Sequence, residues 1–119
     1  PWEDAAVADC LFCSIVAGDI PADVVLSTDA VLAFRDIEPQ APTHVLVIPK
    51  FHYENVGALG AEDPALAGHL ADAARQVAEA DGIGDAYRLV FNTGAGAGQS
   101  VFHVHGHVLG GRDLTWPPG

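Results

Sequence analysis

Three of the chain's six histidines alternate along one short apolar stretch, at His103, His105 and His107. In a β-strand, residues i, i+2 and i+4 point to the same face of the sheet. The spacing therefore predicts a strand over residues 101–109 that carries three imidazoles in a row. Imidazoles titrate near neutral pH, and three of them in register are an unusual choice for a buried apolar strand. This stretch is the first candidate for the chemistry of the protein.

The alternating histidines fit three interpretations. Alternate histidines on one strand can bind a single metal ion. One histidine can instead act as a nucleophile that is flanked by two helpers. The strand can also simply be polar and face solvent. The spacing alone does not separate a ligand from a nucleophile.

A glycine-rich run, NTGAGAGQS over residues 92–100, leads directly into the histidines. It is no Walker A loop, because no lysine follows the glycines and the next predicted element is a strand. Alternating glycine and alanine let the backbone approach a ligand and turn several N–H groups toward an anion. A plain glycine hairpin is the alternative. Gln99 and Ser100 are placed to donate hydrogen bonds to a phosphate.

Cys10 and Cys13 form a Cys-x-x-Cys pair near the beginning of the sequence. The pair can be a redox couple, half of a metal site or two buried small residues. A thioredoxin-like couple opens a helix after a core strand, and no strand is predicted before Cys10. A zinc site with two cysteines and two histidines is the better alternative, with histidines from His44, His52 or the C-terminal row.

The charge balance limits the partners. The 119 residues include 5 Lys and Arg against 16 Asp and Glu, which gives a net charge of −11. A nucleic-acid groove or an anionic membrane surface needs many basic side chains, so neither is expected as a partner. An anionic substrate has to be held by imidazoles and backbone N–H groups. No apolar run reaches the ~20 residues of a membrane span, and no secretion signal is evident. We therefore expect a cytoplasmic protein with reduced cysteines.

The length suits one domain with a single core. Residues 1–9 are acidic and aperiodic, which predicts a tail or edge segment. Predicted helices cover residues 10–17 and 62–81, and predicted strands cover residues 24–26, 31–34, 44–48 and 87–92 besides the histidine strand. This order predicts an α+β fold. In the long helix, Asp63 is the expected N-cap before Pro64. Its apolar stripe at helical spacing consists of Leu66, Leu70, Ala73, Ala74 and Val77.

Three segments resemble the histidine triad (HIT) family, and within it the branch of histidine triad nucleotide-binding proteins (HINT). They are DIEPQAPTHVLVIPK over residues 36–50, GQSVFHVHGHVL over residues 98–109 and GGRDLTWPPG over residues 110–119. The resemblance extends from about Cys10 to Gly119. It implies a single HIT domain over residues 1–119, with a five-stranded antiparallel sheet, one long and one short helix, and a homodimer. Gly106 departs from the family pattern, which has a larger apolar residue there, so we expect looser packing beneath the histidine row.

The HINT resemblance implies hydrolysis of purine nucleoside 5′-phosphoramidates. His105 matches the nucleophile, His107 a phosphate ligand beside Ser100, and His44 a histidine in the proton path. The other matching positions bind the nucleotide: Asp36 at the ribose hydroxyls, Phe12, Ile20 and Ile37 around the base, Asn92, Gly98 and Gln99 on the phosphate side, and Trp116 toward the partner subunit's site.

This chain also resembles many bacterial HIT proteins, and the related galactose-1-phosphate uridylyltransferases, at their zinc-binding positions. These proteins bind zinc through a Cys-x-x-Cys, a histidine soon after the Pro-Lys and the first triad histidine. Cys10, Cys13, His52 and His103 occupy those positions here. A closed site of this kind is structural. HINT members without the cysteines work without metal, so the resemblance does not require zinc for the chemistry.

Three rival functions remain open. The first is a dinucleoside polyphosphate hydrolase of the other HIT branch, although the WPPG tail over residues 116–119 favours the HINT branch. The second is a nucleotide-binding regulator whose catalysis is incidental. The third is a metalloenzyme in which all three triad histidines bind one catalytic ion.

Overall fold

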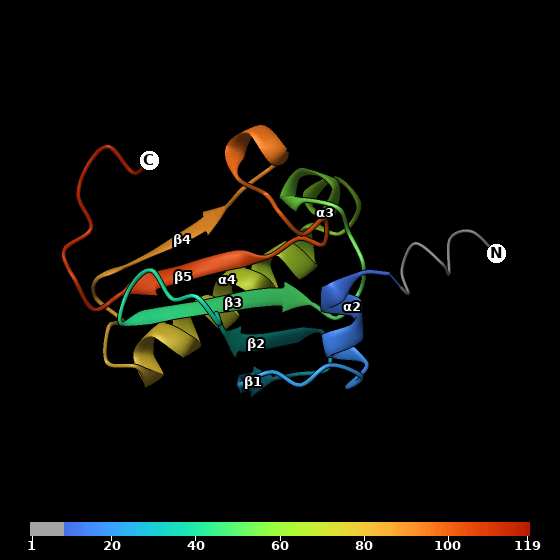
Figure 1. Ribbon diagram of the computed structural model, residues 1–119, viewed down its shortest axis with the longest axis horizontal. Coiled ribbons are helices and arrows are strands. Elements are labelled where there is room, and N and C mark those ends of the chain that lie inside the picture. The colour runs from blue at the N-terminus through green and yellow to red at the C-terminus, as the bar shows by residue number, and fades with distance from the viewer. Residues whose placement is uncertain (1–8) are drawn as a thin grey trace.

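Five antiparallel strands form one sheet in the order β1-β2-β3-β5-β4. The computed structural model describes residues 9–119, so the segment predicted over residues 1–9 lies outside it except for Asp9. The strands are β1 (Val24–Ser27), β2 (Val31–Arg35), β3 (Thr43–Pro49), β4 (Tyr87–Phe91) and β5 (Gly106–Gly110). The last strand of the chain, β5, lies between β3 and β4 (Figure 1). The predicted α+β class and five-stranded antiparallel sheet are confirmed.

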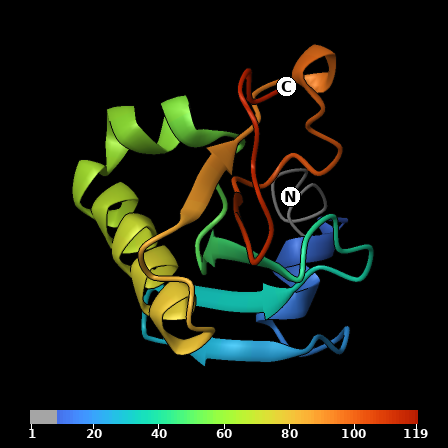
Figure 2. The ribbon, with the colours of Figure 1, turned by 90° about the vertical axis from the view of Figure 1, so that its left-hand side faces the viewer.

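Helices cover both sides of the sheet. The helices α3 (Val56–Glu62) and α4 (Pro64–Ala80) lie on one side, the helix side, and α2 (Leu11–Val16) lies on the other, the pocket side (Figure 2). Alternate residues of β2 and β3 point to opposite sides. The helix side buries Val31, Ala33, Val45 and Val47 against α4. The pocket side buries Leu32, Phe34, Leu46 and Ile48 with Phe12 of α2.

The long helix α4 has the predicted features. Asp63 Oδ1 accepts a hydrogen bond from the Leu66 N–H at 3.1 Å, and Pro64 is the first helical residue. All five residues of the predicted apolar stripe are buried. The chain turns away at Gly82, whose φ of 75° favours glycine. The predicted cap, stripe and end of this helix are confirmed.

The sequence pattern did not reveal α3. Asn55 Oδ1 caps this helix by accepting a hydrogen bond from the Ala58 N–H at 2.9 Å, and its Leu59 is fully buried. Gly57 and Gly60 lower the helix propensity of the 7-residue segment, so no helical period stands out in the sequence. Packing of Leu59 in the core stabilises a helix that propensity alone does not predict. Over residues 9–119, none of the helices combines the length and apolar character needed to cross a bilayer.

The predicted strand over residues 101–109 is too long at its beginning. β5 starts only at Gly106, which pairs with Val47 of β3. Continuing the same register would pair Val104 with Pro49, and proline has no N–H to donate. The Pro49 carbonyl instead accepts a hydrogen bond from His103 Nε2 at 2.9 Å, and the Val104 N–H donates to the Tyr53 carbonyl at 2.7 Å. Of the three triad histidines, only His107 therefore lies in a strand.

Gly106 does not loosen the packing, contrary to the expectation from the family pattern. It is buried on the helix side and pairs with Phe91 of β4. A Cβ at this position would lie 2.7 Å from Leu89 Cδ1 and 2.9 Å from Phe91 Cζ. The two neighbouring side chains fill the space that a larger residue would occupy.

We expect the substitution Gly106→Ala to lower the free energy of unfolding by about 1–3 kcal/mol, because an added methyl group overpacks this site. Denaturant-induced unfolding measures the change. Gly68→Ala is the matched control, since apart from the backbone of α4 itself and the neighbouring residues no atom lies within 4 Å of a Cβ at this position. It should raise the free energy of unfolding by roughly 0.5–1 kcal/mol. Unchanged stability in Gly106→Ala would contradict the packing described for Leu89 and Phe91.

Candidate active site

His105 has the geometry of a nucleophile. Its side chain is only 7% exposed, and Phe12 packs edge-on against its ring with centroids 5.0 Å apart. Nδ1 lies 2.8 Å from the His103 carbonyl oxygen. Because a carbonyl only accepts, Nδ1 carries the proton, and Nε2 of the neutral ring keeps its lone pair. The backbone thus fixes the tautomer in which Nε2 can attack an electrophile.

His44 and His107 form a second chain of imidazoles. The Gln40 N–H donates to His44 Nδ1 at 3.0 Å, so the proton of neutral His44 is on Nε2. This Nε2 lies 2.9 Å from His107 Nδ1. His44 therefore donates to His107 Nδ1, and the proton of neutral His107 is on Nε2. His107 thereby keeps one N–H donor, next to His105, at a ring-centroid distance of 5.0 Å.

Burial keeps this second chain neutral. It lowers the pKa of His107 from 6.5 to about 4, with smaller contributions from His105 and His44. Burial also lowers the pKa of His44, although the nearby Asp36 carboxylate opposes this change. Asp36 Oδ2 lies 3.4 Å from His44 Nε2. Near neutral pH, His44 and His107 are therefore neutral imidazoles with defined donors and acceptors.

The depressed pKa of His107 predicts how stability depends on pH. As the pH falls from about 6.5 to about 4, the unfolded chain binds a proton at this histidine before the folded protein does. Its contribution to stability is therefore complete above pH 6.5 and is lost through this window. The substitution His107→Gln should make the free energy of unfolding less dependent on pH there, as urea titrations at several pH values would measure. His69→Gln changes an exposed histidine and is the control. Parallel curves for wild type and His107→Gln would contradict the prediction.

A pocket of about 640 Å³ lies on the pocket side of the sheet, next to these histidines. Its apolar wall comes from α2 and from side chains around the ends of β1 and β2. Its polar end combines Asp36, Ser100, His105 and His107. An apolar pocket with a few convergent polar groups is typical of a small-molecule site. Seven of the predicted site residues line it: Phe12, Ile20, Asp36, Ile37, Ser100, His105 and His107.

The structure places the other predicted site residues differently. His44, predicted in the proton path, does not line the pocket and contacts His107, which does. Asn92, Gly98, Gln99 and Trp116 do not line the pocket, and Trp116 is 82% exposed.

The Gln99 side chain is not free to bind a phosphate, which corrects that expectation. Its Nε2 donates to the Glu54 and Val101 carbonyls, at 2.7 and 3.1 Å, and its Oε1 accepts from the Gly94 N–H at 2.8 Å. Gln99 is only 3% exposed, and these hydrogen bonds connect the glycine-rich run to the neighbouring segments. This run forms a 3₁₀ turn, η1 (Ala95–Ala97), between Gly94 and Gly98, which have φ values of 84° and 92°.

Three backbone groups of the site were missed in the sequence. The Gln40 N–H fixes the tautomer of His44, the Pro49 carbonyl fixes that of His103, and the His103 carbonyl fixes that of His105. Every non-proline residue has an N–H and every residue has a carbonyl, so no sequence signal marks these three. The only hint was the pair of prolines at 39 and 42, which indicated a loop before His44.

A second cluster contains Cys10, Cys13, His52 and His103. One ligand atom from each residue lies within 4.8 Å of the other three. His103 Nδ1 is 3.5 Å from both sulfur atoms, and Cys13 Sγ is 3.3 Å from His52 Nδ1. Ligand atoms around one tetrahedral zinc ion are separated by about 3.3–3.8 Å, given Zn–N and Zn–S bonds of about 2.0 and 2.3 Å. The geometry and the donor types therefore fit zinc.

The protonation states in this cluster also fit a cation. His103 donates from Nε2 to the Pro49 carbonyl, which leaves the Nδ1 lone pair directed at the sulfur atoms. Burial and the neighbouring Cys10 raise the pKa of the Cys13 thiol to about 12. A cation is needed to stabilise the thiolates, and metal binding would release their protons. The cluster joins α2 to the segment that carries His105.

The triad histidines thus belong to different groups. His103 lies with the two cysteines, whereas His107 lies with His44 and Asp36. His105 lies between them, with its Nδ1 bonded to the backbone of His103. This separation does not support a single catalytic ion that is bound by all three.

Comparisons of the sequence and the structure with known proteins point to one family. The HIT domain family model matches residues 17–114. The chain is 52% identical over 111 residues to an uncharacterized HIT-like protein of Synechocystis, covering 93% of this chain and 97% of that protein. It is similar to the crystal structure of a HIT family hydrolase from Legionella pneumophila, with a TM-score of 0.89, 50% identity and coverage of 93% and 100%. A histidine triad protein from Clostridium difficile has a TM-score of 0.84 and 37% identity, with coverage of 90% and 94%.

Proposed function

The chain belongs to the HIT domain family, and we propose that it hydrolyses purine nucleoside 5′-phosphoramidates through a covalent intermediate on His105. The observation that carries this proposal is the fixed tautomer of His105, which leaves Nε2 unprotonated at the polar end of the pocket. Similar proteins from Legionella pneumophila and Clostridium thermocellum are HIT family hydrolases, at 50% and 42% identity, which supports a hydrolytic reaction. The HINT resemblance supports the phosphoramidate as substrate.

In the first step, His105 Nε2 attacks the α-phosphorus and forms a P–N bond. The bond from phosphorus to the amine breaks, and its electron pair leaves with the nitrogen, which takes one proton from solvent. The His107 Nε2–H donates a hydrogen bond to a phosphate oxygen beside the hydroxyl of Ser100. His44 keeps His107 in the donor tautomer throughout. The amine leaves, and the nucleotidyl group remains on His105.

In the second step, water attacks the same phosphorus. The bond from phosphorus to His105 Nε2 breaks, and its electron pair returns to the nitrogen. The water releases one proton to solvent, so the proton taken up in the first step is returned. The products are the nucleoside monophosphate and neutral His105, with Nδ1–H still bonded to the His103 carbonyl. Two displacements through a good nucleophile replace one difficult displacement.

The rest of the pocket suits a purine nucleotide. Phe12, Ile20 and Ile37 supply the apolar wall for the base, and Asp36 lies at the polar end, where it can accept from the ribose hydroxyls. Asp36 Oδ1 accepts the Glu38 N–H at 2.8 Å, which orients the carboxylate and leaves lone pairs for the sugar.

Zinc and a second copy of the chain complete the proposal. Zinc bound by Cys10, Cys13, His52 and His103 would stabilise the fold around His105 without taking part in the reaction. The homodimer would form along β4, one of the two outer strands of the sheet, with Trp116 reaching toward the partner subunit's site.

Comparing two substrates tests the reaction class. We expect adenosine 5′-monophosphoramidate to be cleaved with a higher kcat/KM than a diadenosine polyphosphate, measured by chromatographic assay of released AMP. Faster cleavage of the polyphosphate would instead assign the chain to the dinucleoside polyphosphate hydrolases.

A further inference from the structure

The carboxylate of Asp81 joins two strand ends on the helix side of the sheet. Arg35 Nη1 and Nη2 donate to its Oδ2 and Oδ1, at 2.9 and 3.0 Å. Thr43 Oγ1 donates to Oδ2 at 2.9 Å. Arg35 is the last residue of β2, Thr43 is the first of β3, and Asp81 directly follows α4. One carboxylate therefore connects three elements.

The position of Asp81 is not explained by the helix itself. Asp81 is the C-cap of α4, where unsatisfied carbonyls make a nearby carboxylate unfavourable. The two-pronged hydrogen bonding to Arg35 offsets this repulsion and lowers the pKa of Asp81, to which the Thr43 hydroxyl adds. With side chains 20% and 39% exposed, the pair is partly shielded from solvent. The contacts across the sheet therefore account for an acidic residue at this helix end.

Each residue held by Asp81 is followed by a residue of the candidate site. Asp36 follows Arg35, and His44 follows Thr43. Successive side chains of a strand point to opposite sides, so contacts on the helix side fix the direction of the next side chain on the pocket side. The Asp36 N–H donates to the His44 carbonyl at 3.0 Å, which continues the pairing of the two strands. Asp81 thus holds the backbone from which Asp36 and His44 project.

We propose that Asp81 is a positioning residue for the ribose end of the pocket, because it sets the placement of Asp36 through Arg35 and Thr43. This inference rests on the proposed function, in which Asp36 accepts hydrogen bonds from the ribose hydroxyls. Asp81 itself lies on the opposite side of the sheet and does not line the pocket. Its effect on KM should therefore be confined to substrates that have ribose hydroxyls, whereas displacement of His44 would lower kcat for both kinds of substrate.

The test compares Asp81→Asn with wild type on two substrates, adenosine 5′-phosphoramidate and its 2′,3′-dideoxy analogue. We expect wild type to prefer the ribonucleotide, through a lower KM. Asp81→Asn should raise KM for the ribonucleotide by about tenfold, with kcat changed much less, and should leave KM for the dideoxy analogue unchanged. The ratio of KM for the dideoxy analogue to KM for the ribonucleotide, which measures the preference for ribose, therefore falls toward one.

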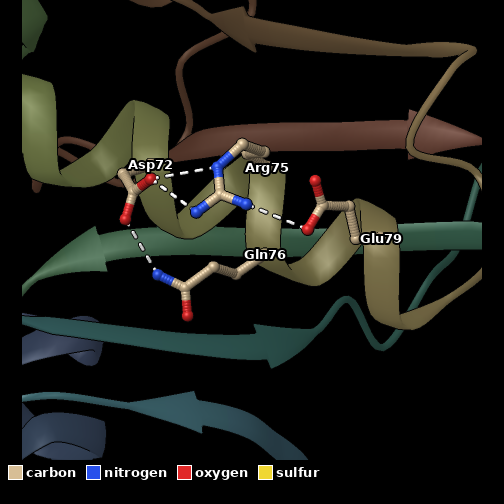
Figure 3. Close-up of polar contacts among 4 residues, drawn as sticks. All are labelled: Asp72, Arg75, Gln76 and Glu79. Carbon is tan, nitrogen blue, oxygen red and sulfur yellow. Dashed lines mark hydrogen bonds and ion pairs between the residues drawn. The ribbon is translucent and has the colours of Figure 1, made fainter.

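Asp72→Asn is the matched control on the same helix. Asp72 pairs with Arg75 and Gln76 on the exposed surface of α4, as Figure 3 shows, and Arg75 also pairs with Glu79. The control removes the same charge and one arginine partner without touching a strand, so it should keep the wild-type preference. Thr43→Val and Thr43→Ser provide a second comparison if Asp81→Asn fails to fold. Valine should lower the preference for ribose, whereas serine keeps the hydroxyl and should retain it.

Several outcomes would overturn the inference. One is an equal rise in KM for both substrates in Asp81→Asn, which indicates general destabilisation. Another is an unchanged ribose preference in Asp81→Asn or, where that variant does not fold, in Thr43→Val. Equal KM values of wild type for the two substrates would also overturn it, because Asp36 would then not bind the ribose. A wild-type protein that cleaves neither substrate would instead refute the proposed function.

Discussion

Replacing His105 by alanine lowers kcat for a nucleoside phosphoramidate by at least about 10⁴-fold, the scale seen when a catalytic nucleophile is removed. Without this imidazole, no other imidazole among residues 9–119 presents a free lone pair in the pocket, because the lone pair of His107 Nδ1 accepts from His44. AMP binding should change only a few-fold, since Phe12, Ile37 and Asp36 still line the pocket. Single-turnover kinetics and a binding titration measure the two quantities separately.

His69→Ala is the control for this experiment, because His69 is exposed on α4 and lies outside the pocket. It should leave both kcat and AMP affinity unchanged. Substantial turnover by His105→Ala would contradict the nucleophilic role. If the variant also kept every biological activity of the protein, a nucleotide-binding regulator would be the better description.

We expect a strong chelator to lower stability far more than it lowers the activity of the protein that remains folded, because we propose that the four-residue cluster binds structural zinc. An ion present at 1,000 times its dissociation constant stabilises the folded state by about 4 kcal/mol. Its loss corresponds to roughly 15 °C in melting temperature for a chain of this size. Thermal melts with and without a strong chelator, together with metal analysis of the purified protein, measure the effect.

The double variant Cys10→Ser, Cys13→Ser is the control, because it lacks the thiolates and should melt at the same low temperature with or without chelator. Catalysis by the metal would be indicated if the activity of the wild-type protein disappeared at once on chelation, without unfolding, and returned when the metal was added back. That result would contradict a purely structural role.

The parts of the fold that depend on local patterns followed from the sequence. The cap at Asp63 and the apolar stripe of α4 were predictable because both act within one helix. The beginning of the histidine strand was not, because it depends on Pro49, a residue of the neighbouring strand that cannot donate a hydrogen bond. α3 was missed since the packing of Leu59, and not its propensity, stabilises it.

The candidate site divides in the same way. Alternation identified the three triad histidines, but only their surroundings separate them. His103 turns toward sulfur atoms 90 and 93 residues away, and His105 toward the backbone. The prediction that the Gln99 side chain binds a phosphate was wrong, because its amide donates to backbone carbonyls instead. One of these belongs to Glu54, 45 residues earlier in the chain. Long-range contacts of this kind leave no trace in residue spacing.

Trapping the intermediate tests the central claim most directly. The protein is mixed with adenosine 5′-phosphoramidate, quenched within the turnover time without acid, digested and analysed by mass spectrometry. The account predicts one adenylyl group on the peptide that contains His105, located on this residue by fragmentation, and no adduct in His105→Ala. An adduct on another residue, or its persistence in His105→Ala, would contradict nucleophilic catalysis by His105.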